Sequence, residues 1–231
     1  MRYLELQEKL KDFTVFSLSD IRKIEPKFYR HRLNEWQEKG YIKKIRQGFY
    51  TFLDLKINEP VLFLMANTIY QPSYISLEMA FSLHHLIPEA VYGITSVTSL
   101  KTNSFKTDMG NFIYHHIKPE LMFGYELREY NNHRYLVAEM EKALLDYLYL
   151  HSHIKNTQDF EGLRFNDTEF KEKADRNKLK KYLELFKSKA LSNRVHKFIT
   201  YIDHAQSFQH RKILSRQGTT LQEKYFAGIF A

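Results

Sequence analysis

The chain has 231 residues, of which 43% are hydrophobic and 27% charged, as expected for a folded protein of one or two domains. It has no cysteine, which excludes disulfides, thiol catalysis and cysteine-bound zinc or iron–sulfur clusters. The longest apolar run, residues 61–66, is far shorter than the ~18 residues of a membrane span. Charges scattered through the first nine residues argue against a signal peptide, so we expect a cytoplasmic protein with no membrane partner.

The formal net charge of +8 is unevenly distributed along the chain. Residues 1–56 contain 13 Lys/Arg and 8 Asp/Glu, residues 57–150 contain 6 and 10, and residues 151–231 contain 16 and 9. Basic segments attract nucleic acid or acidic protein surfaces through their long-range field. Judged by charge alone, these lysines are equally well explained as ordinary solvated surface residues.

Three short helices and a hairpin are predicted within residues 1–56. A first helix covers residues 4–13, and Ser17 with Asp20 has the spacing of a capping box for a second. A third helix is predicted over residues 27–39, after Pro26 and before the terminator Gly40. The β-prone runs 41–46 and 49–52 flank a Gly-containing turn, which predicts the hairpin.

This order is that of a winged helix-turn-helix domain, in which the third helix enters the major groove and the hairpin, or wing, contacts the backbone. Arg and Asn can read guanine and adenine, while wing cations neutralise phosphates. At about 100° per residue, Trp36 lies on a packing face shared with Tyr29 and Leu33, so we expect it in the core. The predicted DNA-binding residues are Lys27, Tyr29, Arg30, His31, Asn34, Lys43, Lys44, Arg46 and Gln47. The alternatives are ordinary surface charge on a small helical domain, or a winged helix that contacts protein.

An α+β core is predicted over residues 57–155. Its helices cover residues 61–70 and the segment between Ser76 and Pro88, and residues 135–137 lead into a long helix ending at Leu150. Its strands are predicted at residues 93–98, 112–117 and 123–127. Two amphipathic helices follow, at residues 167–189 and 192–208. We interpret their lysines as solvated faces rather than as contacts to DNA or to an acidic partner.

Several strings in residues 1–155 resemble the AbiEi family of antitoxins from type IV abortive-infection toxin–antitoxin systems. The more distinctive ones are Ser76-Leu77-Glu78 with Ala80, His84 and Leu86-Ile87-Pro88-Glu89; Ile94-Thr95-Ser96-Val97-Thr98; Gly124-Tyr125; and Ala138 with Glu141-Lys142-Ala143-Leu144-Leu145-Asp146. The opening Arg32-Leu33, Gly40-Tyr41-Ile42 and Gly48-Phe49-Tyr50 is similar to that family's winged helix.

The resemblance implies a bifunctional protein. Its winged helix would bind inverted repeats in double-stranded DNA at its own promoter, and the remainder would counter a nucleotidyltransferase-like toxin without needing to bind it directly. We therefore expect an α+β protein with a winged helix-turn-helix domain over residues 1–56. The antitoxin domain would cover residues 57–212, comprising a mixed α/β core (57–155) and a helical extension (156–212), and residues 213–231 would form a tail.

Enzymatic function has little support in the sequence. The histidine pairs 84–85 and 115–116 and the residues 151–153 belong to no metal-binding framework, and no phosphate-binding or nucleophile-elbow motif is present. Arg128 and His133 match a loose ribonuclease spacing, which leaves a nuclease as the weakest hypothesis. We expect no catalytic residue, no metal site and no cofactor. A protein-interaction module that binds a toxin or a regulator is the alternative to a DNA-binding antitoxin.

Overall fold

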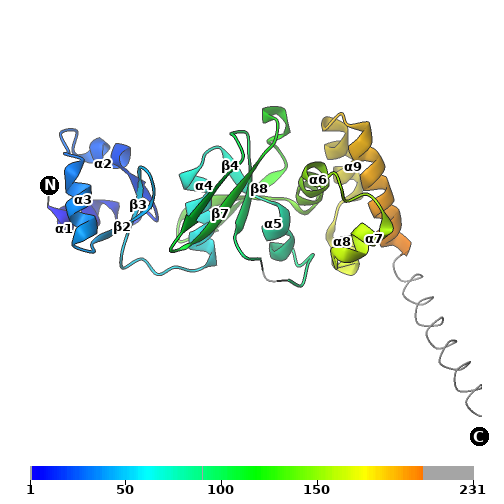
Figure 1. The fold of residues 1–231 in the computed structure, drawn as a ribbon, viewed down its shortest axis with the longest axis horizontal. Helices are drawn as coiled ribbons and strands as arrows, with labels where there is room; N and C mark the ends of the chain where they lie inside the picture. The colour runs from blue at the N-terminus through cyan, green and yellow to red at the C-terminus, as the bar shows by residue number, and fades with distance from the viewer. Residues whose placement is uncertain (1, 90, 205–231) are drawn as a thin grey trace, which may run out of the picture.

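The computed structural model describes residues 2–89 and 91–204 and is a mixed α+β fold with two sheets (Figure 1). The chain forms an N-terminal unit, then a central sheet with its helices, then a group of C-terminal helices. The predicted tail at 213–231 and the last residues of the predicted helix 192–208 lie outside the described residues. Within the described part, none of the helices combines the length and apolar character needed to cross a membrane.

The N-terminal unit has the predicted order of three helices and a hairpin. Its apolar side chains form a cluster of their own, in which Trp36 is 4% exposed, as expected for a core residue. The strands pair antiparallel in the order β1-β3-β2. The elements are α1 (Tyr3–Leu10), β1 (Phe16–Ser17), α2 (Leu18–Ile24), α3 (His31–Glu38), β2 (Ile42–Arg46) and β3 (Phe49–Phe52).

Local sequence signals explain the boundaries of these elements. The Ser17 hydroxyl accepts a hydrogen bond from the Asp20 amide at 3.3 Å, and the Asp20 carboxylate accepts one from the Ser17 amide at 3.0 Å. This capping box confirms the predicted start of α2. Gly40 and Gly48 have φ of +67° and +86°, which end the segment after α3 and close the hairpin turn.

The central sheet has six strands in the order β6-β7-β5-β4-β9-β8. Pairs β4–β9 and β5–β7 are parallel, and the other neighbours are antiparallel. The strands are β4 (Ser73–Ile75), β5 (Ile94–Thr98), β6 (Asn103–Thr107), β7 (Gly110–His116), β8 (Tyr125–Tyr130) and β9 (His133–Ala138). The associated helices are α4 (Glu59–Ile69), α5 (Leu77–Leu83), the single 3₁₀ turn η1 (Pro119–Leu121) and α6 (Met140–Leu150).

Helices cover both faces of this sheet. Strand pairing places Tyr74, Val97 and His115 in one row, so Tyr114 lies on the opposite face. Tyr74 donates its hydroxyl proton to Asp146 of α6, whereas Tyr114 donates to the Ala66 carbonyl of α4. Helices α4 and α6 therefore pack on opposite faces, and the strands between them are buried on both sides.

Two sequence expectations are wrong, and two strands were not predicted. Residues 135–137 belong to strand β9, paired with β8, rather than to the start of the helix, which begins at Met140. The short strand β4 and the largely exposed strand β6 were not predicted, because three residues or a polar run give no clear alternating pattern. The predicted helix 167–189 is broken at Ala174, whose ψ is 133°.

The C-terminal helices continue from α6 and pack on it. They are α7 (Thr157–Gly162), α8 (Asp167–Lys173), α9 (Arg176–Leu185) and a further helix over residues 189–204. The Asp175 carboxylate caps α9 by accepting the Asn177 and Lys178 amides at 2.8 and 3.1 Å. The Arg194 side chain donates to the Leu148 carbonyl at 3.1 Å, which fixes the last helix to the end of α6.

A buried polar network joins α6 to β4. Lys142 and Asp146, one turn apart on α6, form an ion pair with both side chains 0% exposed. The Lys142 ammonium also donates to the Tyr74 hydroxyl at 2.8 Å, and Asp146 accepts from Tyr74 at 2.8 Å and from Ser76 at 2.9 Å. Burial lowers the pKa of Lys142 and raises that of Asp146, while their mutual attraction opposes both shifts.

Removing one member of this network is expected to leave the other charge buried without its partner. Asp146→Asn or Lys142→Met alone should lower the free energy of unfolding by about 3–5 kcal/mol. The double variant Lys142→Met/Asp146→Asn should lose less than the sum of the two single changes, because it leaves no unpaired charge. Urea unfolding monitored by circular dichroism measures all of these values. Additive losses would show that the pair does not act as a unit.

Candidate nucleic-acid interface

The turn between α2 and α3 differs from the sequence prediction. Helix α3 begins at His31, four residues later than predicted, because Phe28 is drawn into the N-terminal core. The Phe28 side chain is 2% exposed, and its ring lies 5.5 Å from that of Trp36. Tyr29, expected on the packing face of a longer helix, is instead 69% exposed. The buried Phe28 ring therefore fixes the position of the turn before α3.

Five of the predicted DNA-binding residues surround this end of α3 and are exposed: Lys27, Tyr29, Arg30, His31 and Asn34. Within residues 2–89 and 91–204, the side chains of Lys27, Arg30 and Asn34 make no hydrogen bond or ion pair. His31 is already paired, with its Nε2 3.6 Å from the Glu35 carboxylate. A guanidinium, an amide and an ammonium thus present unused donors at one end of the molecule.

The β2–β3 hairpin has two faces with different surroundings. Ile42 packs into the N-terminal cluster, whereas Ile45, 5% exposed, belongs to the larger cluster of the central sheet. Lys44 and Gln47 are exposed, and the Lys44 ammonium has no partner in the described part of the chain. These two predicted residues remain open to a ligand.

Arg46 lies in an aromatic site between the hairpin and the central sheet. Its guanidinium carbon is 4.5 Å from the ring centre of Phe105 on β6, 5.3 Å from that of Phe49 and 5.6 Å from that of Tyr70. Such contacts attract a cation to the ring faces. The Nη1 atom is buried and has no hydrogen-bond partner within the described residues. Arg46 therefore faces the protein rather than a phosphate.

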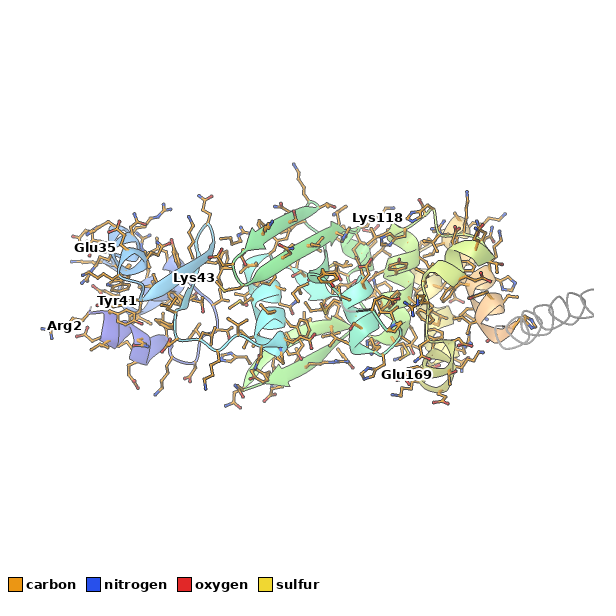
Figure 2. The ribbon with its side chains drawn as sticks, turned by 60° about the horizontal axis from the view of Figure 1, so that its bottom comes forward. Arg2, Glu35, Tyr41, Lys43, Lys118 and Glu169 are labelled. Atoms are coloured by element: carbon orange, nitrogen blue, oxygen red, sulfur yellow. The ribbon has the colours of Figure 1, made fainter. Side chains whose placement is uncertain are left out.

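Lys43 is engaged at the same place. Its ammonium lies 3.1 Å from the Asp108 carboxylate in the β6–β7 turn, with 38% and 79% of the two side chains exposed. Figure 2 shows Lys43 on the side of the N-terminal unit that faces the central sheet, with Glu35 of α3 on the far side. We call this contact of Lys43, Ile45 and Arg46 with Tyr70, Phe105 and Asp108 the hairpin–sheet junction. A cavity of about 670 Å³ opens beside it, lined by Arg46, Phe49, Tyr70 and Arg134 among others.

Three of the six histidines considered for metal binding are held by backbone carbonyls. Rings of His84, His116 and His151 donate to the carbonyls of Ala138, Leu100 and Tyr147 at 2.8–3.0 Å. Across residues 2–89 and 91–204, no three His, Asp or Glu side chains gather in a way that could hold a metal ion. The Arg128 side chain donates to Glu126 at 2.7 Å.

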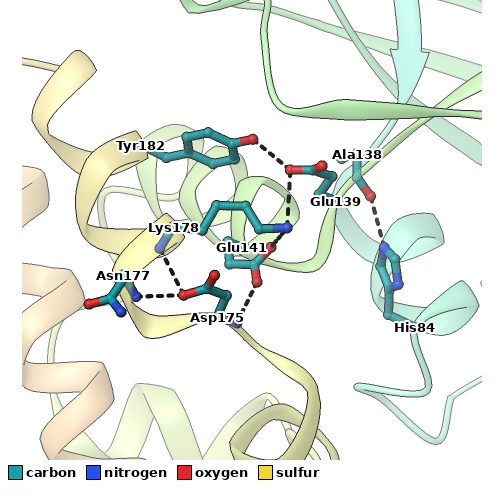
Figure 3. Close-up of polar contacts among 8 residues, drawn as sticks. All are labelled: His84, Ala138, Glu139, Glu141, Asp175, Asn177, Lys178 and Tyr182. Atoms are coloured by element: carbon teal, nitrogen blue, oxygen red, sulfur yellow. Dashed lines mark hydrogen bonds and ion pairs between the residues drawn. The ribbon is translucent and has the colours of Figure 1, made fainter.

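A polar cluster that the sequence analysis did not identify joins α6 to α9 (Figure 3). The Lys178 ammonium lies 3.3 Å from Glu141 and 3.5 Å from Glu139, and the Tyr182 hydroxyl donates to Glu139 at 2.6 Å. Burial alone would lower the pKa of Lys178, but the two carboxylates raise it overall. Burial and the Glu139 carboxylate raise the pKa of Tyr182 to about 12. Every charge here has a partner, so the cluster joins helices and offers no free group.

The sequence analysis missed two polar groups, the Lys142–Asp146 network and the cluster around Lys178. The sequence signal for both lies in α6. Glu141, Lys142 and Asp146 interrupt an otherwise apolar helix, and their side chains are at most 3% exposed. Charged residues on a buried helix require partners, which the sequence alone could not locate because they come from β4 and α9.

Comparison with models of protein families gives no match, and a search among curated proteins gives none either. The function must therefore be argued from the arrangement of the residues and from the sequence resemblance.

Half-buried His84 should make the free energy of unfolding depend on pH. Burial lowers the pKa of His84 and outweighs its hydrogen bond to Ala138 and the nearby Glu126 and Glu141, which raise it, while Arg128 lowers it further. Below the unfolded pKa of about 6.5, the unfolded chain binds a proton that the native state does not, so stability falls as the pH falls.

His84→Gln keeps an N–H donor without titrating and should flatten this loss between pH 7.5 and the lower native pKa. Burial also lowers the pKa of His115. This histidine should therefore leave a residual dependence of stability on pH with the same sign. The measurement is urea unfolding across that pH range, and an unchanged slope would contradict the assignment.

Proposed function

We propose that the chain is a DNA-binding transcriptional repressor whose N-terminal unit is a winged helix-turn-helix domain. The observation that carries this proposal is the set of exposed, unpartnered donors of Lys27, Arg30 and Asn34 at the start of α3. An α-helix fits the major groove, where Arg pairs with guanine and Asn with adenine through two hydrogen bonds each. The opposite side of α3 is anchored in the core by Leu33 and Trp36, so these donors are held on a rigid support.

The position of α3 supports this reading. In Figure 1 the helix lies in the N-terminal unit on the side away from the central sheet, so a duplex can approach it without meeting the rest of the molecule. Lys44 and Gln47 extend the exposed surface on the hairpin. In this arrangement Arg30 and Asn34 supply base discrimination, and Lys27 and Lys44 neutralise phosphates.

We further propose an antitoxin role of the AbiEi kind, acting against a nucleotidyltransferase-like toxin, with the operator formed by inverted repeats in the protein's own promoter. Three of the strings that carry the resemblance are coupled in space, which supports it. Ser76 binds Asp146, and Gly124 sits so close to Lys142 that an added Cβ would lie 3.1 Å from the lysine Cβ. The three strings therefore contribute to one packed core.

Loss of the α3 donors should reduce sequence preference. Arg30→Ala and Asn34→Ala should each cost about 1–3 kcal/mol of discrimination between the protein's own upstream DNA and a scrambled duplex. Lys44→Ala should instead weaken binding to both duplexes and reduce the salt slope by about 0.9. Gel shifts over a salt series measure these effects, with the remote exposed lysine changed in Lys180→Ala as the control. Equal binding of the wild-type chain to both duplexes would refute sequence-specific recognition.

The antitoxin role predicts separable activities. In cells that express a nucleotidyltransferase-like toxin encoded beside the gene, co-expression of this chain should restore growth. The variant Arg30→Ala/Asn34→Ala should still restore growth, because these two residues lie far from the proposed antitoxin core. Growth curves with the wild-type chain as the reference give the measurement. Rescue that fails in this variant while the protein remains folded would favour a winged helix that acts through protein contact.

A further inference from the structure

Two of the hairpin cations are held within the protein. Lys43 faces Asp108, and Arg46 is enclosed by the rings of Phe49, Tyr70 and Phe105. Both were expected on phosphates, but while the hairpin–sheet junction is intact each has a partner within the protein instead. The proposed DNA-binding surface is therefore only partly available in this arrangement.

The junction leaves one strong donor unsatisfied. Arg46 Nη1 is buried without a hydrogen-bond partner among the described residues, which carries an energetic cost. A phosphate oxygen would accept a charge-assisted hydrogen bond from this group. If Arg46 left the aromatic site, its Nη1 could therefore form the hydrogen bond that it lacks in the docked arrangement.

The second contact is of the kind that DNA can replace. The Lys43–Asp108 pair is largely exposed, and such pairs contribute little stability in water. Asp108 places a carboxylate where a backbone phosphate would have to come to bind the same ammonium. The carboxylate already uses part of the charge and one donor of this ammonium, so the acidic turn competes with a phosphate for Lys43.

Burial of Ile45 supplies the opposing force. This side chain is 5% exposed and, with Val15, is the part of the N-terminal unit that joins the central core. Exposing this apolar side chain to water is unfavourable, so the docked arrangement is favoured without DNA.

We propose that the face of the hairpin formed by Lys43 and Arg46 is a binding surface with two alternative occupants, the β6–β7 turn of the central sheet and the phosphate backbone of DNA. The docked form binds DNA weakly through α3 and Lys44, and full binding requires the hairpin to leave the sheet. By linkage, DNA then weakens docking as much as docking weakens DNA binding. This inference rests on the proposed DNA-binding function.

A cross-link across the junction tests the proposal. The chain has no cysteine, so the variant Lys43→Cys/Asp108→Cys offers only two reactive thiols. A short bismaleimide would join them and hold the hairpin docked, while N-ethylmaleimide would cap the same thiols without joining them. Binding of both products to a short random-sequence duplex is measured over a salt series, with native folding checked by circular dichroism.

The cross-linked product should bind about ten- to a hundredfold more weakly than the capped one, because Arg46 cannot form its charge-assisted contact. Its salt slope should be shallower by about 0.9, corresponding to one lost phosphate contact. Equal affinity and equal slope in the two products would overturn the proposal. Absence of DNA binding by the wild-type chain would instead overturn the proposed function.

A charge change that needs no cross-linker gives an independent check. Asp108→Asn should raise affinity for the same duplex about two- to fivefold by freeing Lys43. Glu184→Gln removes the same charge from an exposed site on α9 and should change affinity less. If Glu184→Gln raises affinity as much as Asp108→Asn, only net charge is involved and Asp108 does not compete.

Discussion

Strand β2 is shared by two hydrophobic cores, and the rest of the arrangement depends on this constraint. Side chains alternate across a strand, so Ile42 enters the N-terminal cluster from one face of β2 and Ile45 enters the central cluster from the other. The pairing with β3 is irregular between Lys44 and Arg46, so Arg46 lies against the central sheet with Lys43 rather than in solvent with Lys44. Because its apolar side chains enter two cores, the hairpin is not a free finger.

This division separates two kinds of contact within the proposed DNA surface. The donors at the start of α3 are exposed and rest on a helix anchored by Trp36, so the proposed base contacts would come from a pre-organised support. Lys43 and Arg46, by contrast, have intramolecular partners, which DNA would displace under the proposed function. Recognition by α3 and backbone contact by the hairpin can therefore respond differently to changes in the central domain.

The central and C-terminal parts are held by polar groups that are fully paired. Lys142 and Asp146 tie α6 to β4, and Lys178 ties α9 to the start of α6. Buried charges of this kind require well-defined partners, and they specify one arrangement more than they add stability. The strings that resemble an antitoxin family converge on this framework, which gives those residues a structural reason to occur together.

The sequence by itself determined the elements whose signals are local. The capping box at Ser17, the glycines at 40 and 48 and the β-prone runs at 94–98 and 110–116 depend on neighbouring residues and were predicted close to their places. Only the tertiary structure decided where α3 begins, because Phe28 is pulled from a helical pattern into a core built from distant residues. It also decided that Arg46 and Lys43 face the protein, since Phe105 and Asp108 lie about sixty residues away, and sequence periodicity carries no information across that distance.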